Sequence, residues 1–486
     1  MPDAWGARRT IVVVGGGFSG TLFALAASLR PGLDVVLVER EAQAGLGLAY
    51  GACEGCHVLN VPVARMEVGL VPSFTSWLQA SGADLSAALA EAGGELSQAF
   101  VPRGLFGAYM VERLEQALAG EGGEPPRLRR VRGEVVQVVE RPSPGVVLAD
   151  GRRIEAAQVV LATGNLPPKP PRGRDGWFYD TPHFIPDPWD ARELGKLDPD
   201  APLVLIGTGL TMVDVALKLS LAGHRGPLVA VSRHGLVPAV HQAGGSFEPF
   251  LTPEAAPTPV AGLRAIRAAV RKAAAAGVPW HRVMDAVRPA IAAVWSHWPL
   301  AEKARFLRHA RTYWDVHRHR MAPRIATGFA ALTASGQVRT VAGRIAGYQR
   351  RPGGVTVSVR HRGAATVERL DVAAVLNCTG PRSDFGDIGL PLFARLREAG
   401  RIVPDALGLG LESHGCALVD RYGFASDWLY ALGPLTRPAW WEITAVPEIT
   451  AQVHRLVEEL AAGDKPAGAD GRAALLADFV NLGEGI

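Results

Sequence analysis

Residues 10–40 carry the pattern that most restricts the fold. They read as an apolar strand, a turn of glycines, an apolar helix and a second strand that ends in an acid. In the turn, Gly15, Gly17 and Gly20 form a GxGxxG motif, whose glycines permit a sharp bend, a close approach of backbone to a pyrophosphate, and tight packing of helix on strand. The stretch predicts a βαβ unit that binds a dinucleotide at the N-terminus of its helix.

Glu39 ends the second strand of this unit. A carboxylate at that place accepts hydrogen bonds from the hydroxyls of an adenosine ribose and repels a 2′-phosphate. The unit should therefore bind a dinucleotide that lacks this phosphate. The residues expected to contact it are Gly15, Gly17, Ser19, Gly20, Glu39 and Arg40.

A second unit of the same kind begins at Leu203. Met212 stands where a third glycine is usual, so helix and strand should lie further apart here. The second strand ends in Ser232-Arg233-His234, and an arginine at that place can pair with a 2′-phosphate and stack on adenine, which favours NADPH. The alternative is that Arg233 is an ordinary solvated side chain. The expected contacts are Gly207, Thr208, Gly209, Thr211 and Arg233.

Composition excludes several classes of protein. The chain has 486 residues, of which 48% are hydrophobic and 20% charged, as in a packed α/β enzyme of more than one domain. The formal net charge of +4 comes with no basic tail, so we expect no nucleic-acid partner. The apolar run at 11–14 stops at glycines without a cleavage site, and no apolar stretch reaches the ~18 to 20 residues that span a bilayer. We expect a cytoplasmic protein with no membrane partner.

The expected fold class is α/β, with two Rossmann-like dinucleotide-binding domains and a helical insert. Strand-like runs at 133–165 close on Ala162-Thr163-Gly164, and a proline-rich linker follows. The segment 253–324 is rich in alanine and arginine at helical spacing, and we expect it to cap the second domain. The expected boundaries are 1–170 for the first part of the first domain, 171–370 for the second domain with the insert 253–324, and 371–486 for the second part of the first domain.

Several motifs together resemble a known family. The segments GLGLAY, HVLNVP, FVPRGLFGAY, LATGN, WDVHRHRMAP, NCTGP and WWEITAVPEI are similar to those of bacterial FAD/NAD(P)-binding proteins, flavoproteins with FAD in the first domain and NADPH in the second. The segment GTGLTMVD resembles the GxGxSxxD fingerprint of flavin-containing and N-hydroxylating monooxygenases, with Thr211 at the serine position. A flavin-dependent urate hydroxylase is among the relatives of this group.

The resemblance implies further contacts with FAD. They are Asn60, Thr163, Gly164, Gly433 and Thr444. The helix expected to begin at Pro447 would direct its positive N-terminus toward flavin N1. Two features depart from related flavoproteins: Gly433 precedes Pro434 where Gly-Asp is common, and the segment 176–190 lacks the FxGxxxH spacing of Baeyer-Villiger enzymes.

The run Cys53-Glu54-Gly55-Cys56-His57 matches a haem c attachment signature. Haem c is attached outside the cytoplasm, and the resembling family has no cysteines in this loop, so we interpret the match as incidental. A disulfide reductase remains an alternative, although such enzymes typically place four residues between their cysteines. With four cysteines in all we expect no disulfide framework, and the histidines lack a ligand spacing that would indicate a metal.

The resemblance implies hydride transfer from NADPH to FAD, then reaction of the reduced flavin with O2 to a C4a-(hydro)peroxyflavin that hydroxylates a small polar substrate, such as urate or an amine. A flavin reductase or dehydrogenase without oxygenation and a non-catalytic redox sensor remain alternatives. The partners are then a small-molecule substrate and O2, and a homo-oligomer remains open. The catalytic candidates are His317, Arg318 and Asn60, with Trp314, His319, Trp441 and Glu442 as further substrate contacts.

Overall fold

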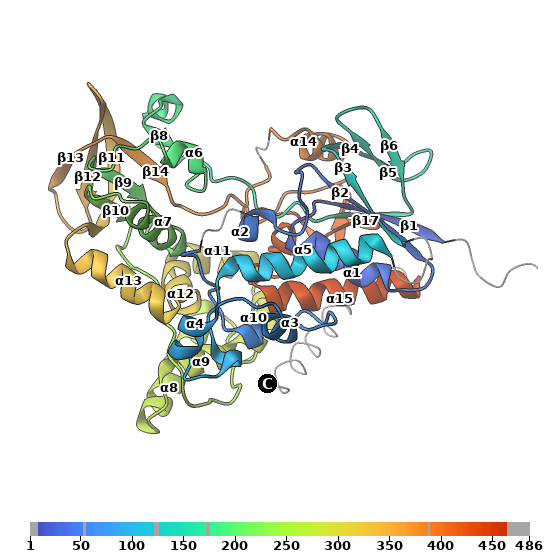
Figure 1. The fold of residues 1–486 in the computed structure, drawn as a ribbon, viewed down its shortest axis with the longest axis horizontal. Coiled ribbons are helices and arrows are strands. Elements are labelled where there is room, and N and C mark those ends of the chain that lie inside the picture. The colour runs from blue at the N-terminus through green and yellow to red at the C-terminus, as the bar shows by residue number, and fades with distance from the viewer. Residues whose placement is uncertain (1–7, 52–54, 121–125, 172–174, 387–388, 464–486) are drawn as a thin grey trace, which may run out of the picture.

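Two seven-stranded sheets form the framework of the protein, and each contains one of the two expected βαβ units (Figure 1). The computed structural model describes residues 8–51, 55–120, 126–171, 175–386 and 389–463. The arrangement confirms the expected α/β class with two Rossmann-like units.

The first sheet has the order β15-β16-β17-β7-β1-β2-β3, and β17, β7, β1, β2 and β3 run parallel. Its central strands are buried on both faces, which explains their continuous apolar sequence. A small antiparallel sheet, β4-β5-β6, packs on one face. The strands are β1 (Arg9–Val14), β2 (Leu33–Glu39), β3 (Leu128–Arg132), β4 (Val135–Val139), β5 (Gly145–Leu148), β6 (Arg153–Glu155), β7 (Gln158–Leu161), β15 (Ser413–His414), β16 (Ala417–Val419) and β17 (Ala425–Ala431).

Helices α1, α5 and α15 lie together on the opposite face of this sheet (Figure 1). The first unit also contains short 3-10 helices at Val63–Arg65, Leu96–Gln98 and Gly433–Thr436. Its helices are α1 (Phe18–Ser28), α2 (Gly47–Gly51), α3 (Phe74–Ala80), α4 (Ser86–Glu91), α5 (Arg103–Ala119), α14 (Pro391–Glu398) and α15 (Val446–Ala462).

The second sheet has the order β13-β12-β11-β10-β9-β14-β8. Strand β11 pairs parallel with β10 and then continues into an antiparallel meander with β12 and β13. Because β14 pairs with β9, this sheet continues past the boundary that the sequence placed after residue 370. The strands are β8 (Phe184–Ile185), β9 (Leu203–Ile206), β10 (Leu228–Ser232), β11 (Val338–Arg351), β12 (Gly354–His361), β13 (Val367–Val372) and β14 (Ala374–Asn377).

The helices of the second unit include α7, which follows the second glycine turn, and α13, which connects the insert to β11. Two 3-10 helices occur at Gly176–Asp180 and Arg288–Ala290. The helices are α6 (Ala191–Leu194), α7 (Leu210–Leu221), α8 (Pro259–Ala275), α9 (Trp280–Val287), α10 (Ile291–His297), α11 (Leu300–His309), α12 (Arg311–Arg318) and α13 (Pro323–Ala334).

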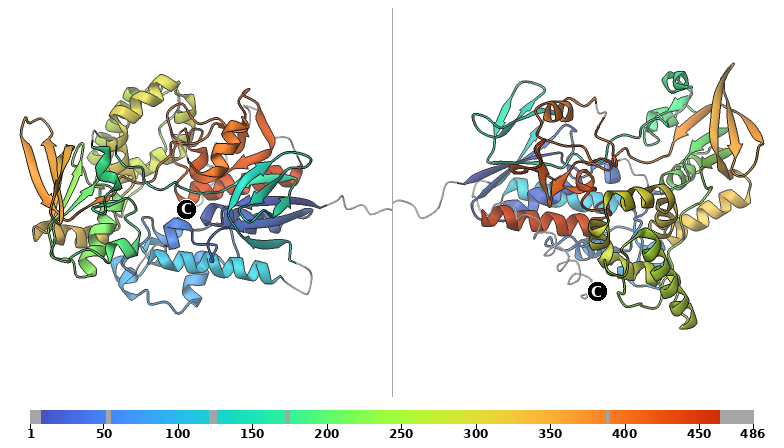
Figure 2. Two further views of the ribbon diagram at one scale, coloured as in Figure 1. Left: turned by 90° about the horizontal axis from the view of Figure 1, so that it is seen from above. Right: turned by 180° about the vertical axis from the view of Figure 1, so that it is seen from behind.

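The insert, helices α8 to α12, lies between the two units rather than over the second alone (Figure 2). Trp295 of α10 stacks on Trp441 with ring centroids 4.8 Å apart, and its Nε1 donates to the Pro438 carbonyl at 2.8 Å. On the other side, the Ala239 amide donates to the Val316 carbonyl at 2.8 Å. The insert was expected to cap the second domain alone, but it also packs on the first unit. The reason is that aromatic side chains of the insert contact aromatic side chains of the C-terminal segment.

Within the described ranges, no helix combines the length and hydrophobicity that crossing a bilayer requires. The same residues contain no group of three or more histidine, cysteine or acidic side chains placed to hold a metal ion.

Candidate functional site

The first glycine turn is built so that side chains cannot occupy it. Gly15 has φ +105°, and a Cβ there would lie 2.5 Å from the Ala162 carbonyl oxygen. A Cβ on Gly20 would lie 1.9 Å from the carbonyl oxygen of Gly15, so α1 packs directly on the turn. Gly17 begins α1 without a side-chain cap. The first amides of α1 are therefore available to a pyrophosphate, as the motif predicts.

Glu39 lies beside this turn. Its Oε2 accepts from the Gly16 amide at 2.6 Å and its Oε1 accepts from the Glu41 amide at 2.9 Å. These bonds hold the carboxylate at the end of β2, where the sequence placed the adenosine ribose. Arg40 is exposed and pairs with Glu41 at 3.4 Å, so its guanidinium is directed to that side chain.

The surroundings of the turn are also compatible with a large cofactor. A Cβ on Gly47 would lie 3.0 Å from the Cα of Gly17, and one on Gly433 would lie 2.8 Å from the Ser19 hydroxyl oxygen. The Thr163 hydroxyl oxygen is buried and has no hydrogen-bond partner among the described residues. Close contacts that only glycines permit and an unused buried hydroxyl are compatible with an extended dinucleotide such as FAD.

Gly433, where related flavoproteins have Gly-Asp, is held by α15. Its amide donates to Gln452 Oε1 at 2.8 Å, and Gln452 Nε2 donates to Thr436 Oγ1 at 2.8 Å. Thr444, expected to contact FAD, is exposed just before α15, and its amide donates to the Glu442 carbonyl at 2.6 Å.

The second glycine turn repeats the construction of the first. Gly207 has φ +111°, and a Cβ there would lie 2.5 Å from the Cys378 carbonyl oxygen. Gly209 begins α7 without a side-chain cap, and Thr211 is half-buried in its first turn. The Thr208 hydroxyl donates to the Leu236 carbonyl and contacts Ser232 Oγ at 2.9 Å. Thr208 therefore ties the turn to the end of β10.

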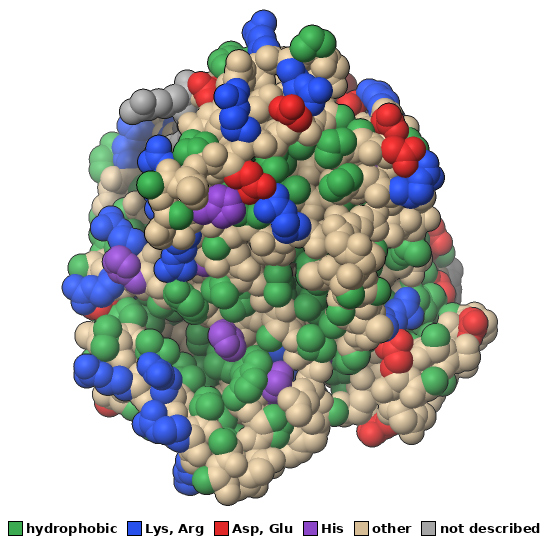
Figure 3. All heavy atoms as spheres, turned by 90° about the vertical axis from the view of Figure 1, so that its left-hand side faces the viewer, with side chains coloured by type: hydrophobic (Ala, Val, Ile, Leu, Met, Phe, Trp, Pro, Cys, Tyr) green, Lys and Arg blue, Asp and Glu red, His purple; other side chains and the backbone are tan. Residues whose placement is uncertain are grey.

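The end of β10 is strongly basic. Arg233 is exposed and has no hydrogen bond or ion pair in the part of the chain that the structure describes. His234 Nδ1 lies 2.8 Å from Arg362 Nη1. Burial lowers the pKa of His234, and Arg362, Arg233 and Arg344 lower it further. Figure 3 shows this side of the molecule, where Lys and Arg side chains gather in groups around a depression lined by hydrophobic side chains.

The expected catalytic residues have different surroundings in the structure. His317 is exposed on α12; its Nδ1 donates to the Tyr313 carbonyl at 2.7 Å and its ring meets Trp280. His319 follows the end of α12 and is half-buried toward Glu442, and burial lowers its pKa. Asn60 is half-buried, and its carbonyl accepts from His241 Nε2 at 2.8 Å. His317 is thus exposed whereas Arg318 points to Glu442, because adjacent residues of α12 face different sides of the helix.

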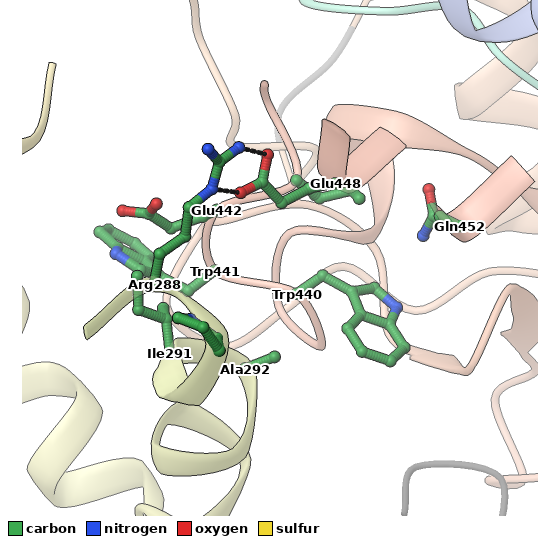
Figure 4. Close-up of a pocket in the computed structure, with 10 residues that line it drawn as sticks. Arg288, Ile291, Ala292, Trp440, Trp441, Glu442, Glu448 and Gln452 are labelled. Atoms are coloured by element: carbon green, nitrogen blue, oxygen red, sulfur yellow. Dashed lines mark hydrogen bonds and ion pairs between the residues drawn. The ribbon is translucent and has the colours of Figure 1, made fainter. Parts of the chain in front are cut away.

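The remaining candidates meet in a buried network of ion pairs. Arg318 Nε donates to Glu442 Oε2 at 2.6 Å, and Trp314 Nε1 donates to Glu442 Oε1 at 2.8 Å. Arg288 binds both oxygens of Glu448, at 2.5 and 2.8 Å (Figure 4). Arg318 also lies 3.7 Å from Glu448. The network joins the insert to the N-terminal turn of α15.

Sequence reasoning missed Arg288 and Glu448. Burial opposes ionisation of Glu448, but Arg288 and then Arg318 hold its pKa below the ordinary value. The first turn of α15 therefore carries a carboxylate that arginines neutralise. A glutamate directly after Pro447 was the available signal, because acids favour the first turn of a helix. Trp441 lies under Arg437, whose guanidinium is 4.4 Å from the ring centroid, so its ring is part of the core.

Two cavities lie along the contacts between the units. The first lies between the insert and α15 (Figure 4). The second includes the expected Gly164. The first is lined by Arg288, Pro289, Ile291, Ala292, Trp440, Trp441, Glu442, Ile443, Glu448 and Gln452. The second is lined by Gly164, Asn165, Pro381, Arg382, Ser383, Phe385, Pro434 and Arg437.

The His57 ring, which a haem c site would need as a ligand, is buried and meets the edge of Trp189 at 5.6 Å between centroids. Cys53 lies outside the described residues.

Comparison with known proteins identifies the first unit. Residues 12–166 match a family described as FAD-NAD(P)-binding. None of the curated proteins compared with the chain matches it in sequence.

Solved structures resemble the whole chain. An ornithine N-hydroxylase from Kutzneria sp. 744, solved with reduced FAD, NADP+ and L-ornithine, covers 94% of this chain and 99% of its own at TM-score 0.63 and 16% identity. Ornithine hydroxylase from Pseudomonas aeruginosa covers 94% and 99% at TM-score 0.61 and 14% identity. The FAD-bound cadaverine monooxygenase of desferrioxamine biosynthesis from Erwinia amylovora covers 95% and 96% at TM-score 0.63 and 11% identity. Residues 12–166 are therefore a FAD-NAD(P)-binding domain, and the whole chain has the fold of flavoproteins with two dinucleotide-binding domains.

Proposed function

We propose that the protein is an FAD-dependent, NADPH-using monooxygenase that hydroxylates a small polar substrate. One observation carries the proposal: two glycine turns of the same construction end in opposite charges, Glu39 at the first and Arg233 at the second. A carboxylate suits the free ribose of FAD, whereas an unpaired guanidinium suits the 2′-phosphate of NADPH. A resident flavin and a transient phosphorylated nicotinamide follow from that contrast.

Analogy with the similar proteins favours an oxygenase. The similar proteins named above are hydroxylases of ornithine and a monooxygenase of cadaverine, and their similarity extends over nearly the whole length of both chains. At 16% identity or less, this similarity supports the reaction class by analogy of fold and leaves the substrate open.

The residues of the chain would divide the work as follows. The amides after Gly15 and Gly207 bind the two pyrophosphates, and Glu39 and Arg233 select the cofactors. Bound flavin supplies the hydride acceptance and the activation of O2. The insert closes over the C-terminal segment and excludes water, because its aromatic face is buried against Trp441.

The test begins with the purified protein and its flavin spectrum. NADPH consumption, O2 consumption and hydroxylated product are then measured over a panel that includes urate and amines. We expect a bound FAD, and a substrate that accelerates NADPH oxidation and appears hydroxylated in proportion to the NADPH consumed. NADPH oxidation that proceeds only with other acceptors would indicate a reductase. Tight FAD binding without turnover would indicate a sensor, and a chain unable to take up FAD would overturn the proposal.

A further inference from the structure

The chain that follows β10 packs against the antiparallel meander of β11 and β12. A Cβ on Gly235 would lie 3.0 Å from the Cβ of Ala342 in β11. The amide of Arg362, just after β12, donates to the carbonyl of the same Ala342 at 2.9 Å. Arg362 Nη1 also lies 2.8 Å from His234 Nδ1. The end of β10, the middle of β11 and the end of β12 therefore meet at one place on the surface.

Four arginines gather at this place. We define the arginine cluster as Arg233, Arg344, Arg360 and Arg362, all of which are exposed. Arg344 and Arg360 are directly opposite each other in the β11–β12 pair, so they project from the same face of the sheet. Like charges in that position repel, which makes the pair unfavourable in the absence of an anion.

The meander offers the arginine cluster no counter-charge. It contains two acids, and both bind other cations. Glu368 binds Arg339 at 2.6 Å and His361 at 2.8 Å. Asp371 lies 3.7 Å from Arg351. Within the part of the chain that the structure describes, no arginine of the cluster pairs with a carboxylate.

His234 adds a hydrogen-bond donor beside the cluster. A guanidinium can donate but cannot accept, so the contact with Arg362 makes Nδ1 the acceptor and places the proton of the neutral ring on Nε2. The ring also meets Tyr313 of α12 at 5.5 Å between centroids, which restricts its orientation. The acid of α12, Asp315, pairs with Arg311 at 3.4 Å. Among the described residues Nε2 has no partner, and its N–H is available to a ligand.

A phosphomonoester suits this arrangement better than a carboxylate. It carries about 1.5 to 2 negative charges at pH 7 and three acceptor oxygens, whereas a carboxylate offers one charge and two oxygens. Guanidinium groups bind phosphate through paired, charge-assisted hydrogen bonds. The cluster adjoins the end of β10, where a dinucleotide-binding unit places the 2′-position of the adenosine ribose.

We propose that Arg362 and the Nε2 of His234 bind the 2′-phosphate of NADPH together with Arg233, and that Arg344 contributes further positive charge to this site. The proposal rests on the proposed function and names the additional residues that make it specific for NADPH. Selection of the nicotinamide then depends on the meander as well as on the end of β10. A change at Arg362 weakens it while the glycine turn stays intact.

The test measures binding to the FAD-loaded protein without turnover. Calorimetric titration gives Kd for 2′,5′-ADP, which carries the 2′-phosphate, for 5′-AMP, which lacks it, and for inorganic phosphate. The wild type should bind 2′,5′-ADP about 10-fold or more tightly than either of the other two. If inorganic phosphate binds as tightly as 2′,5′-ADP, the cluster is a general phosphate site and the proposal is wrong.

Variants locate the effect. Arg362→Gln should weaken 2′,5′-ADP about 10-fold and change 5′-AMP by no more than about 2-fold, and Arg362→Lys should restore part of the loss. His234→Phe keeps an aromatic ring beside Tyr313 but has no N–H, and should weaken 2′,5′-ADP about 3- to 10-fold. Arg344→Gln should weaken it about 3-fold. Arg351→Gln, at the other end of β11, is the matched control and should leave both Kd values unchanged.

The outcomes separate this proposal from the proposed function. If the wild type prefers 2′,5′-ADP and Arg362→Gln and His234→Phe keep the full preference, these residues do not bind the phosphate and the proposal is wrong. The same holds if Arg362→Gln weakens 2′,5′-ADP and 5′-AMP equally. A wild type that binds both nucleotides equally, and whose flavin NADH reduces as fast as NADPH, would instead contradict the use of NADPH in the proposed function.

Discussion

Arg233 stands at the end of β10 among His234, Arg344 and Arg362, and all the charged groups that shift the pKa of His234 are cationic. A phosphate bound among these groups would offset their repulsion. The corresponding place in the first unit has Glu39, whose carboxylate is held by two backbone amides. At the scale of single residues, the assignment of the two cofactors therefore depends on one guanidinium and one carboxylate.

Replacing Arg233 by alanine should raise KM for NADPH about 10- to 100-fold while changing KM for NADH by no more than about 3-fold. The reason is that charge-assisted hydrogen bonds to the 2′-phosphate, worth roughly 1.5–3 kcal/mol, exist only with NADPH. Steady-state oxidation of both nicotinamides checks this, with Arg271→Ala on α8 as the control. Equal increases in KM for NADPH and NADH would show that Arg233 does not bind the 2′-phosphate.

The half-buried side chain of His241 should make the free energy of unfolding depend on pH. Burial first, and then Arg320, lower its pKa to about 4 from the model-peptide value near 6.5. As pH falls below 6.5 the unfolded chain takes up this proton before the folded one, so the free energy of unfolding decreases toward pH 4. The variant His241→Gln keeps a hydrogen-bond donor for the Asn60 carbonyl. Between pH 7.5 and pH 5, its free energy of unfolding should fall by roughly 1–2 kcal/mol less than that of the wild type.

Urea unfolding at the two pH values measures this difference. His309→Gln, on the exposed side of α11, is the control and should keep the wild-type dependence. If His241→Gln and the wild type lose the same free energy, His241 does not contribute to the pH dependence.

At the scale of elements, the sequence predicted those parts of the fold that depend on residues close together in the chain. The strand, glycine turn and helix of both units, with Gly15 and Gly207 at positive φ, could be predicted because their residues are neighbours in sequence. The place of the insert could not, because it depends on Trp295 meeting Trp441, far away in the chain. The strand β14 was assigned to the wrong side of a boundary for the same reason: its partner β9 is distant in sequence.

The residues of the candidate site also fall into two groups, those that could be predicted from the sequence and those that could not. Glu39 and Arg233 end strands, and the end of a strand can be found from sequence. The pairing of Arg288 with Glu448 spans 160 positions and no periodicity indicates it. His317 was expected near the flavin because it belongs to the segment WDVHRHRMAP of the family resemblance, yet adjacent residues of α12 face different sides of the helix.

Gln452 fixes α15 to the loop that begins at Gly433. It is 1% exposed, and its two amide atoms bond the Gly433 amide and the Thr436 hydroxyl. Gln452→Leu should lower the free energy of unfolding by about 2–4 kcal/mol, since it leaves a buried amide unpaired. It should also lower FAD content, because Gly433 of this loop lies against Ser19 in the first turn of α1. Urea unfolding measures the free energy of unfolding and flavin absorbance measures the FAD content, with Gln98→Leu, a change at an exposed glutamine, as the control. If both variants lose similar amounts of stability and FAD, the prediction is wrong.

At the scale of the whole molecule, two of the motifs that carried the family resemblance meet each other. Arg103, from FVPRGLFGAY, lies 3.2 Å from Asp214, from GTGLTMVD, and its side chain also donates to the Val58 carbonyl. The side chains are 13% and 8% exposed. The acid of the second glycine motif thus serves the contact between the two units, which sets the distance between the two dinucleotide sites.

Asp214→Asn should therefore affect the reaction and the stability together. Removing one member of a buried ion pair costs about 3–5 kcal/mol, because the other charge stays buried without its partner. Arg103→Met with Asp214→Leu removes both charges and should recover part of that loss in a double-mutant cycle. Asp200→Asn breaks the exposed pair with Arg225 and should cost less than about 1 kcal/mol. The rate of flavin reduction by bound NADPH should fall in Asp214→Asn and stay at the wild-type value in Asp200→Asn, since only the former pair fixes one unit on the other. A stable Asp214→Asn variant with a wild-type reduction rate would mean that the insert alone, through Trp295 and Arg288, holds the two units in register.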